Sequence, residues 1–463
     1  RKEVSVYGTN PKRNRLLRIN PFSFPKEVHI YEPLDRLVEI FNVCWPMYAA
    51  MPAILKDAIE RSYVKAGWDL RNSKNKYSEC LFPNFIDVLQ QIDEVMEQSQ
   101  YSSDNKGDYK GALSTRLRSL TTGINSLIFT TDEISAAELF DQNVIIDLSR
   151  VGSSETKSLI MGLLVMKLQE YRIASCNDMN AALNHVTVLE EAHNLLKRTS
   201  TEQITEGSNL LGKSVEMLTN AIAEMRTYGE GFIIADQAPG LLDMAVIRNT
   251  NTKIIMRLPD YSDRELVGRA VGLTDDQIIE LSKLNKGVAA VYQNDWVESV
   301  LCKVKKYSGD NPIFRYEQTD VAKSRDIKGE LISRLIAKDV MHLIDKIDDE
   351  LIVSNIPAAA KCRLFDYVSA PGSQKFDLAA AVAYELFSAE PVFAQLSKVG
   401  RDFEQQKRFI IENLTPSIMP LPEKYGQIIL YLVTYWNARI TESGITKRLL
   451  NNLLETERKE KIV

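Results

Sequence analysis

Residues 185–193 read HVTVLEEAH, and this stretch decides the fold. A run of aliphatic residues ends in two consecutive carboxylates, Glu190 and Glu191, as at the point where a buried strand emerges at the carboxyl edge of a sheet. Open α/β sheets place their ligands at that edge. Carboxylates there can hold a hydrated Mg²⁺ or polarise an attacking water. The alternative interpretation is a strand whose polar end simply meets solvent.

The next strand-like run ends in a similar way. Residues 232–236 read FIIAD and are followed by Gln237. A glutamine just past the strand beside the acidic pair can contact both a γ-phosphate and the attacking water, whereas the alternative is a loop side chain exposed to solvent. Two such strand ends in consecutive positions of one sheet are hard to obtain by accident. They indicate the Walker B and sensor positions of a P-loop nucleotide hydrolase, in which the first acid helps to hold Mg²⁺ and the second acts on the water.

Alternating strands and helices surround these motifs. From about residue 140 to 305, short apolar runs alternate with stretches of helical periodicity, which is typical of an α/β layered sheet. Residues 144–146 and 232–234 are apolar at consecutive positions, as in parallel strands that are covered on both faces. The predicted strands are residues 143–148, 185–190, 231–236, 252–257, 287–292 and 297–303.

The flanking regions look mainly helical. Residues 33–43, 52–65, 83–98 and 111–120 carry apolar residues at helical spacing, and the polar stretch 98–110 is expected to be a loop. Beyond about residue 310 the strands stop. The chain thus divides into an α/β core at 1–32 and 140–309, a helical insertion at 33–139 and a helical C-terminal region at 310–463. The C-terminal region docks on a neighbouring subunit or an effector, or it is purely structural.

Composition narrows the class of protein. Apolar residues make up 44% of the chain and charged residues 26%, as in an ordinary globular protein. The formal net charge of −5 gives no overall attraction to nucleic acid, so any DNA contact has to come from a local patch. The five cysteines form no CxxC pair, which argues against a disulfide framework or a zinc site and favours the cytoplasm. The longest apolar runs are too short to cross a bilayer, so no membrane is expected.

Several longer strings resemble the HerA-type ATPases of the HerA/FtsK superfamily, which includes the type IV secretion ATPases. They are VTVLEEAHNLL at 186–196, AEMRTYGEGFIIADQAPGLL at 223–242 and NTNTKIIMRL at 249–258, together with RINPFSFP at 18–25, ILKDAIERSYVKAGWDL at 54–70 and VIIDLSRVGSSETKSLIMGLL at 144–164. The resemblance covers roughly residues 1–305 and is weaker across 33–130. It implies a RecA-like P-loop NTPase core with a mainly parallel sheet, ATP and Mg²⁺ as cofactors, and a homohexameric ring around DNA or beside a partner protein.

The resemblance also implies roles for single residues. Glu190 and Glu191 match the Walker B pair, with Glu190 toward the metal, and Gln237 matches the sensor glutamine. Arg226 matches the arginine usually implicated in catalysis across the subunit boundary. Such an arginine finger neutralises charge on the transferring phosphoryl group.

The sequence does not rank the candidate arginines. Arg226 precedes Gln237 by eleven positions, at the end of a helix that we expect to face outward along the carboxyl edge of the sheet, toward the nucleotide of the next subunit. A structural ion pair with Glu224 is the alternative. Arg248 and Arg257 are further candidates for contact with the nucleotide.

The phosphate-binding loop departs from the family pattern. No GxxxxGK[ST] loop precedes the acidic pair. Residues 207–214, GSNLLGKS, match formally, but they follow the acidic pair and a polar stretch at 197–206, whereas a P-loop follows a buried strand. We interpret this match as a decoy. Because the chain begins at Arg1 with a strand already in progress at 4–7, we expect the true loop to lie upstream of residue 1.

His193 and a basic cluster near the N-terminus can each be interpreted in two ways. His193 invites a catalytic interpretation, but the resemblance places it at the start of the helix after Walker B, where it caps or packs. A basic cluster meets DNA or a neighbouring subunit, or is a solvated turn; it consists of Lys12, Arg13, Arg15 and Arg18.

The resemblance predicts a ring-forming ATPase that couples ATP hydrolysis to translocation on double-stranded DNA, in DNA processing or phage defence. The alternative is an ATPase ring that acts as a scaffold and regulator of a nuclease or a sirtuin-like NAD-consuming effector. The acidic net charge favours this alternative slightly, since a protein that translocates along DNA usually carries more Lys and Arg residues.

Overall fold

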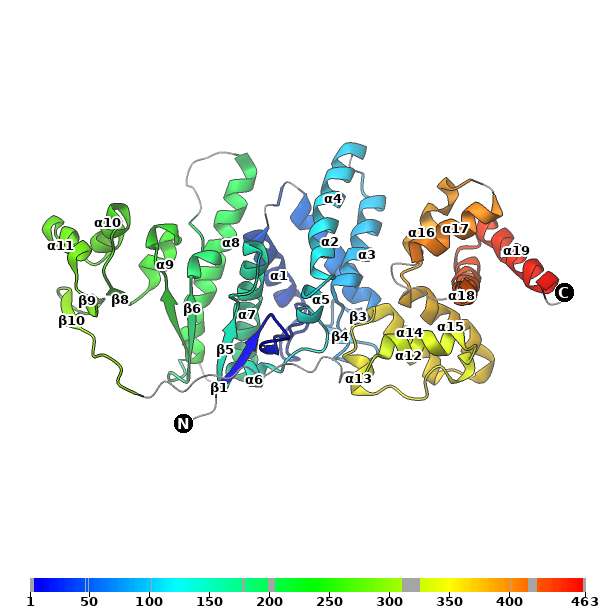
Figure 1. Cartoon of the computed structure of the whole chain (residues 1–463), viewed down its shortest axis with the longest axis horizontal. Helices are drawn as coiled ribbons and strands as arrows, with labels where there is room; N and C mark the ends of the chain where they lie inside the picture. The colour runs from blue at the N-terminus through cyan, green and yellow to red at the C-terminus, as the bar shows by residue number, and fades with distance from the viewer. Residues whose placement is uncertain are drawn as a thin grey trace.

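The structure, a computed structural model, describes residues 4–45, 47–48, 50–100, 102–176, 180–198, 205–309, 325–400, 402–414 and 423–460. Its elements are spread along one long axis (Figure 1). A small sheet with its helices stands at one end, parallel strands and long helices occupy the middle, and the C-terminal helices lie at the other end (Figure 1).

The first part of the chain combines two short strands with a group of helices. Its elements are β1 (Val4–Gly8), β2 (Arg15–Leu16), α1 (Tyr31–Cys44), α2 (Met51–Lys65), β3 (Trp68–Asp69), β4 (Lys74–Asn75), α3 (Phe85–Gln98), α4 (Ser103–Leu120) and α5 (Asn125–Ile128). α3 begins at a capping box, in which the Asn84 side chain and the Asp87 carboxylate accept each other's backbone N–H groups. The helices predicted from apolar spacing in this region are all present.

The stretch 98–110 is not the loop that its polarity predicted, because α4 begins at Ser103. Leu113 and Leu117 in its second half are fully buried, and the helix packs on α3. Side chains in its first half are mainly exposed. The prediction was wrong because polar residues extend a helix readily when apolar residues further along the same helix anchor it to a core.

The second part of the chain alternates strands and helices. Its elements are α6 (Ala136–Phe140), β5 (Asn143–Asp147), α7 (Ser154–Ser175), β6 (His185–Glu190), η1 (Ala192–Asn194), α8 (Thr205–Glu224), η2 (Met225–Tyr228), β7 (Glu230–Ala235), η3 (Pro239–Leu241), α9 (Met244–Asn249), β8 (Thr252–Ile255), α10 (Tyr261–Ala270), α11 (Asp275–Glu280), η4 (Leu281–Lys283), β9 (Val288–Gln293) and β10 (Val300–Lys303). The order follows the sequence prediction. β6 has its predicted bounds, β7 and β9 are shifted by one residue, and β5, β8 and β10 are one to three residues shorter than predicted.

The pairing of the strands confirms the α/β class. β1 pairs in parallel with β2 and β5, and β6 pairs in parallel with β7. β8, β9 and β10 form an antiparallel sheet. The described strands thus form separate small sheets instead of the single layered sheet that the alternation predicted.

One face of the parallel strands is open. Successive side chains of a strand point to opposite faces. Leu189 and Ile234 pack into the main core, whereas Ile145, Val188 and Ile233 are 55%, 55% and 54% exposed. The prediction that both faces are covered was therefore wrong, because the described part of the chain covers only one of them.

The C-terminal region is helical, as predicted. Its elements are α12 (Ile327–Ile336), η6 (Val340–His342), α13 (Asp349–Ile352), α14 (Ala358–Ser369), α15 (Gly372–Leu386), α16 (Glu390–Gln395), η7 (Leu396–Lys398), α17 (Phe403–Leu414), α18 (Glu423–Thr441) and α19 (Gly444–Glu460). The region has its own core and is tied to the preceding helices, since the buried Asp87 carboxylate accepts the Ala358 N–H at 3.0 Å. None of the described helices combines the length and apolar character that a bilayer crossing requires.

The hydrophobic cores do not correspond one to one with the regions predicted from the sequence. The main core joins side chains from β1 through α9, so the predicted insertion shares it with the parallel strands. A second core lies within the C-terminal helices, and a small third core lies under β8 and β9. The boundaries at residues 33, 140 and 310 stay a prediction.

Candidate active site

The parallel pairing of β6 and β7 brings the predicted acidic and glutamine positions to one edge. Glu190 lies opposite Ala235, so both strands end at the same level. Glu191 and Gln237 leave this edge from adjacent strands, and the Gln237 Nε2 group donates to Glu191 Oε1 at 3.1 Å. The side chains that the sequence assigned to water activation and sensing are therefore in contact in the folded chain.

Glu191 has an unusual backbone conformation. Its φ of 52° and ψ of 46° place it in the left-handed region, which is uncommon for a residue with a Cβ atom. Its carbonyl oxygen accepts the Asn194 backbone N–H at 2.9 Å and the Asn194 Nδ2 group at 2.8 Å. The chain thereby turns sharply out of β6 and leaves the Glu191 carboxylate about half exposed. Backbone strain of this kind concentrates at functional sites.

Glu190 and Glu191 point in different directions. Strand alternation places Glu190 on the same face as Val188, which is the open face of the sheet. Glu190 is exposed, and the described residues give its carboxylate no hydrogen bond or ion pair. Its carboxylate is thus accessible to a hydrated Mg²⁺, which usually keeps several of its waters.

Asp236 is a site residue that the sequence interpretation missed. Its side chain is only 3% exposed. Its Oδ2 atom accepts the His193 backbone N–H at 2.9 Å and the His193 Nδ1 group at 2.8 Å, and its Oδ1 atom accepts the Ala238 N–H at 2.9 Å. The pattern held a signal, because Asp236 stands one residue past β7 just as Glu191 stands one residue past β6.

The same residues offer a possible group of metal ligands. One ligand atom from each of Glu191, His193 and Asp236 lies within 4.8 Å of the others. Both Asp236 oxygens already accept hydrogen bonds, Oδ2 from the two His193 donors and Oδ1 from the Ala238 N–H. His193 therefore packs in the turn after β6, in the short η1 helix. We keep Glu190 as the predicted Mg²⁺ residue.

The prediction that Arg226 lies at the carboxyl edge of the sheet was wrong. The η2 helix that contains Arg226 leads through Gly229 directly into the start of β7. A helix that precedes a parallel strand ends at the amino edge of the sheet, which is opposite the edge that carries Glu191. A strand of six residues separates the two edges by roughly 20 Å. Arg226 is exposed, and it makes no ion pair with Glu224 among the described residues.

The other candidate arginines are also exposed. Arg248 lies in the last turn of α9, and Arg257 follows the carboxyl end of β8. Neither contacts Glu191 or Gln237 within the described part of the chain. β8 pairs with β9 and not with β7, so no pairing among the described strands joins Arg257 to the edge that carries Glu191.

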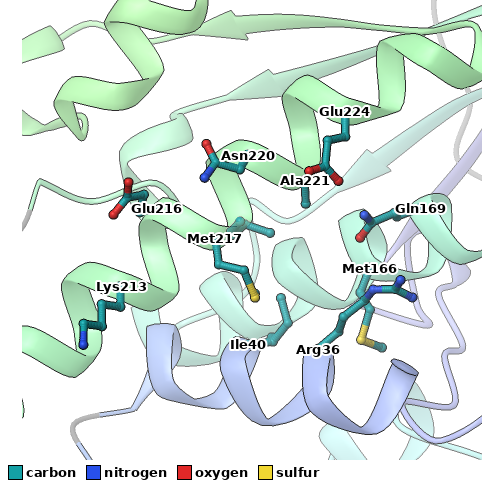
Figure 2. A pocket seen from close by; sticks show the side chains of 11 residues that line it. Arg36, Ile40, Met166, Gln169, Lys213, Glu216, Met217, Asn220, Ala221 and Glu224 are labelled. Carbon is teal, nitrogen blue, oxygen red and sulfur yellow. The ribbon is translucent and has the colours of Figure 1, made fainter. Parts of the chain in front are cut away.

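The formal phosphate-loop match is helical. Residues 207–214 lie inside α8 and do not form a loop between a strand and a helix. Lys213 lines a cavity of about 440 Å³ between α1, α7 and α8, with Arg36, Gln169 and Glu224 among its other lining residues. Figure 2 shows Lys213 and Glu216 on one side of this cavity and Arg36 and Gln169 on the other. A helix gives no cradle of backbone amides for phosphates, so this segment lacks P-loop geometry.

Comparison with known proteins supports the family assignment. The DNA double-strand break repair helicase HerA of Sulfurisphaera tokodaii is 23% identical over 297 residues, which are 63% of this chain and 55% of the relative. HerA of Sulfolobus acidocaldarius is 28% identical over 125 residues, or 27% of this chain and 23% of the relative. The resemblance to the HerA-type ATPases is confirmed. No protein-family model matches the chain.

A probable helicase of Methanocaldococcus jannaschii is also similar to this HerA-like chain, with 25% identity over 175 residues, or 36% of the chain and 32% of the relative. The chain spans about half or less of the length of these curated relatives. Among solved structures, VirB4 of Thermoanaerobacter pseudethanolicus is 14% identical with a TM-score of 0.46, and it covers 66% of this chain and 82% of its own. The plasmid coupling protein TrwB with ADP and Mg²⁺ is 10% identical with a TM-score of 0.44, over 67% and 77% of the two chains.

Proposed function

We propose that this HerA-like chain carries the water-activating half of an ATPase site and couples ATP hydrolysis to movement along double-stranded DNA, in DNA processing or phage defence. The observation that carries the proposal is the contact between Glu191 and Gln237 at the carboxyl edge of β6 and β7. This edge is where open α/β sheets bind ligands. The relatives named as HerA and as a helicase support the same class of activity.

The site supports a division of roles. Glu191 accepts the proton of the attacking water, and Gln237 orients that water against the γ-phosphate. The exposed Glu190 carboxylate takes part in the water shell of Mg²⁺. A positioned general base of this kind contributes about 10²–10⁴-fold to a rate. A Mg²⁺ ion held at Glu190 would supply positive charge against the charge that develops on the transferring phosphoryl group.

A phosphate-binding loop completes the site. We infer that it belongs to a further strand–loop–helix unit, since no strand among the described residues leads into such a loop. The exposed Val188 and Ile233 lie opposite each other on the open face, and one edge of β7 is unpaired among the described strands. A strand added at that edge, with its helix over the open face, would bury both side chains and would bring backbone N–H groups to the same carboxyl edge, next to Gln237.

We further propose a homohexamer. Arg226 lies roughly 20 Å from the carboxyl edge of its own subunit, so as an arginine finger it serves the nucleotide of a neighbour. A ring gives every site such a neighbour. Arg248 and Arg257 remain alternative contacts for the nucleotide.

The second candidate is an ATPase ring that regulates a nuclease or a sirtuin-like effector. The formal net charge of −5 and the large C-terminal helical region favour it, because they suit a protein partner better than a polyanion. ATP hydrolysis by the complete protein, measured with and without double-stranded DNA over a range of salt concentrations, separates the two. A motor shows DNA stimulation that falls steeply with salt, since DNA binding releases counterions. An ATP hydrolysis rate that does not change when DNA is added contradicts the DNA-translocating motor and supports the regulatory ATPase ring.

A further inference from the structure

We propose that Asp236 is the positioning residue that holds the two catalytic turns of the site in register. The proposal rests on the ATPase function proposed above. Asp236 stands between the turn that carries Glu191 and the turn that carries Gln237. It accepts hydrogen bonds from both turns with different oxygen atoms.

The Oδ2 atom of Asp236 fixes the first turn. It accepts the His193 backbone N–H at 2.9 Å and the His193 Nδ1 group at 2.8 Å. Only one residue separates His193 from Glu191, and the His193 ring lies with Nδ1 at 3.6 Å from Glu191 Oε2. The left-handed conformation of Glu191 is unfavourable for a residue with a Cβ atom, so it persists because neighbouring contacts such as these determine the path of the chain.

The Oδ1 atom of Asp236 fixes the second turn. It accepts the Ala238 N–H at 2.9 Å, which closes a short turn around Gln237. Gln237 then reaches back to Glu191 at 3.1 Å. One buried carboxylate thereby sets the relative position of two side chains that come from different strands. The chemistry requires this, because displacement of a catalytic group by about 1 Å can lower a rate by about 100-fold.

Asp236→Asn is an isosteric test of this role. An amide has one acceptor oxygen and an NH₂ group, so it cannot accept on both sides. In either orientation of the amide, its NH₂ group faces the backbone N–H of one of the two turns. These two donors cannot form a hydrogen bond, so that turn is no longer held in place. In the complete protein we expect a fall in kcat of about 10- to 100-fold, with KM for ATP changed less than threefold.

A matched control lies at the other end of the same strand. Glu230 is fully buried and ties β7 to its surroundings, with bonds from Arg172 Nε at 2.9 Å and His185 Nδ1 at 2.7 Å. Glu230→Gln therefore also removes a buried carboxylate but leaves the catalytic turns intact. We expect it to lower the thermal midpoint as much as Asp236→Asn does or more, while kcat stays within about threefold of the wild type. Equal losses of kcat in the two variants overturn the proposal.

His193 provides a second test that keeps Asp236 in place. His193→Ala removes the ring donor but leaves the backbone N–H, so we expect a smaller loss of kcat than with Asp236→Asn, and partial recovery in His193→Gln, which restores a side-chain N–H. Wild-type kcat in both Asp236→Asn and His193→Ala overturns the positioning role. Failure of the proposed function is distinguishable, because in that case Glu191→Gln also retains hydrolysis.

Discussion

Glu170 is a carboxylic acid that folding removes from solvent. It lies in α7, it is fully buried, and the described residues provide no hydrogen bond to either of its oxygen atoms. Burial raises the pKa of Glu170 to about 7, while the positive charges of Lys167 and Arg36 partly oppose the increase. The folded protein therefore holds a proton on Glu170 at pH values where the unfolded chain has released it.

This shift predicts a pH-dependent contribution to stability. A raised pKa in the folded state means that the contribution is fully present below pH 4.5 and is lost as the pH rises through about 7. Relative to a Glu170→Gln variant, the wild type should lose on the order of 3 kcal/mol of unfolding free energy between pH 4.5 and pH 8. Denaturant unfolding of both proteins across this range measures the difference, and a difference that is constant with pH contradicts the prediction.

Lys213 is predicted to be dispensable for nucleotide binding. It lies in the middle of α8 and lines the cavity shown in Figure 2, so it is not part of a phosphate cradle. Lys213→Ala in the complete protein should keep the Kd for ATP within about threefold of the wild type, as expected for a lysine that makes no phosphate contact. Fluorescent-nucleotide titration measures this Kd. A loss of affinity of 100-fold with the helix intact would mean that residues 207–214 do bind phosphate.

At the scale of elements, the strands and helices follow from periodicity, and the motif positions follow from the strands. The proximity of Glu191 and Gln237 could be predicted because parallel strands end at a common edge. The partnership of Asp236 with His193 could not, since it depends on the left-handed turn at Glu191, and a single glutamate carries no signal for that conformation. Backbone conformation at such sites is determined by neighbouring contacts and not by local propensity.

The open sheet face and the location of Arg226 show a second limit of sequence patterns. Ile145 and Ile233 lie in two strands, β5 and β7, whose apolar runs predict coverage on both faces, yet the described chain covers one face only. Apolar runs record which faces are buried in the functional assembly and do not record which element buries them. Arg226 was assigned to the wrong edge because motif spacing gives the distance along the chain and not the direction of the helix.

At the scale of the whole molecule, hydrolysis should require an intact neighbour. Arg226 is too far from the carboxyl edge of its own subunit, so Arg226→Ala should bind ATP but fail to hydrolyse it, with a loss of about 10³-fold or more as for other arginine fingers. Mixing Arg226→Ala subunits with Glu191→Gln subunits should restore part of the activity, because some interfaces then combine an intact Glu191 with an intact Arg226.

Two outcomes would change that account. Full hydrolysis by a monomer, with the mass of the active species checked by light scattering, removes the need for a neighbour. If mixtures stay inactive although native mass spectrometry shows mixed rings, either Arg226 acts within its own subunit or hydrolysis requires an entirely intact ring. Arg257→Ala, tested in the same way, shows whether this exposed arginine, which follows β8, contacts the nucleotide instead.

The central claim is that Glu191 activates the water that attacks ATP, and one pair of variants tests it most directly. Glu265 is a suitable control, since its side chain is 47% exposed against 46% for Glu191 and it lies on α10, outside the site. Single-turnover hydrolysis and ATP binding are measured for Glu191→Gln and Glu265→Gln in the complete protein. We predict that both variants bind ATP as the wild type does, that Glu265→Gln hydrolyses it normally, and that Glu191→Gln is slower by about 10²–10⁴-fold. Wild-type turnover in Glu191→Gln would contradict the assignment of Glu191 and, with it, the proposed site.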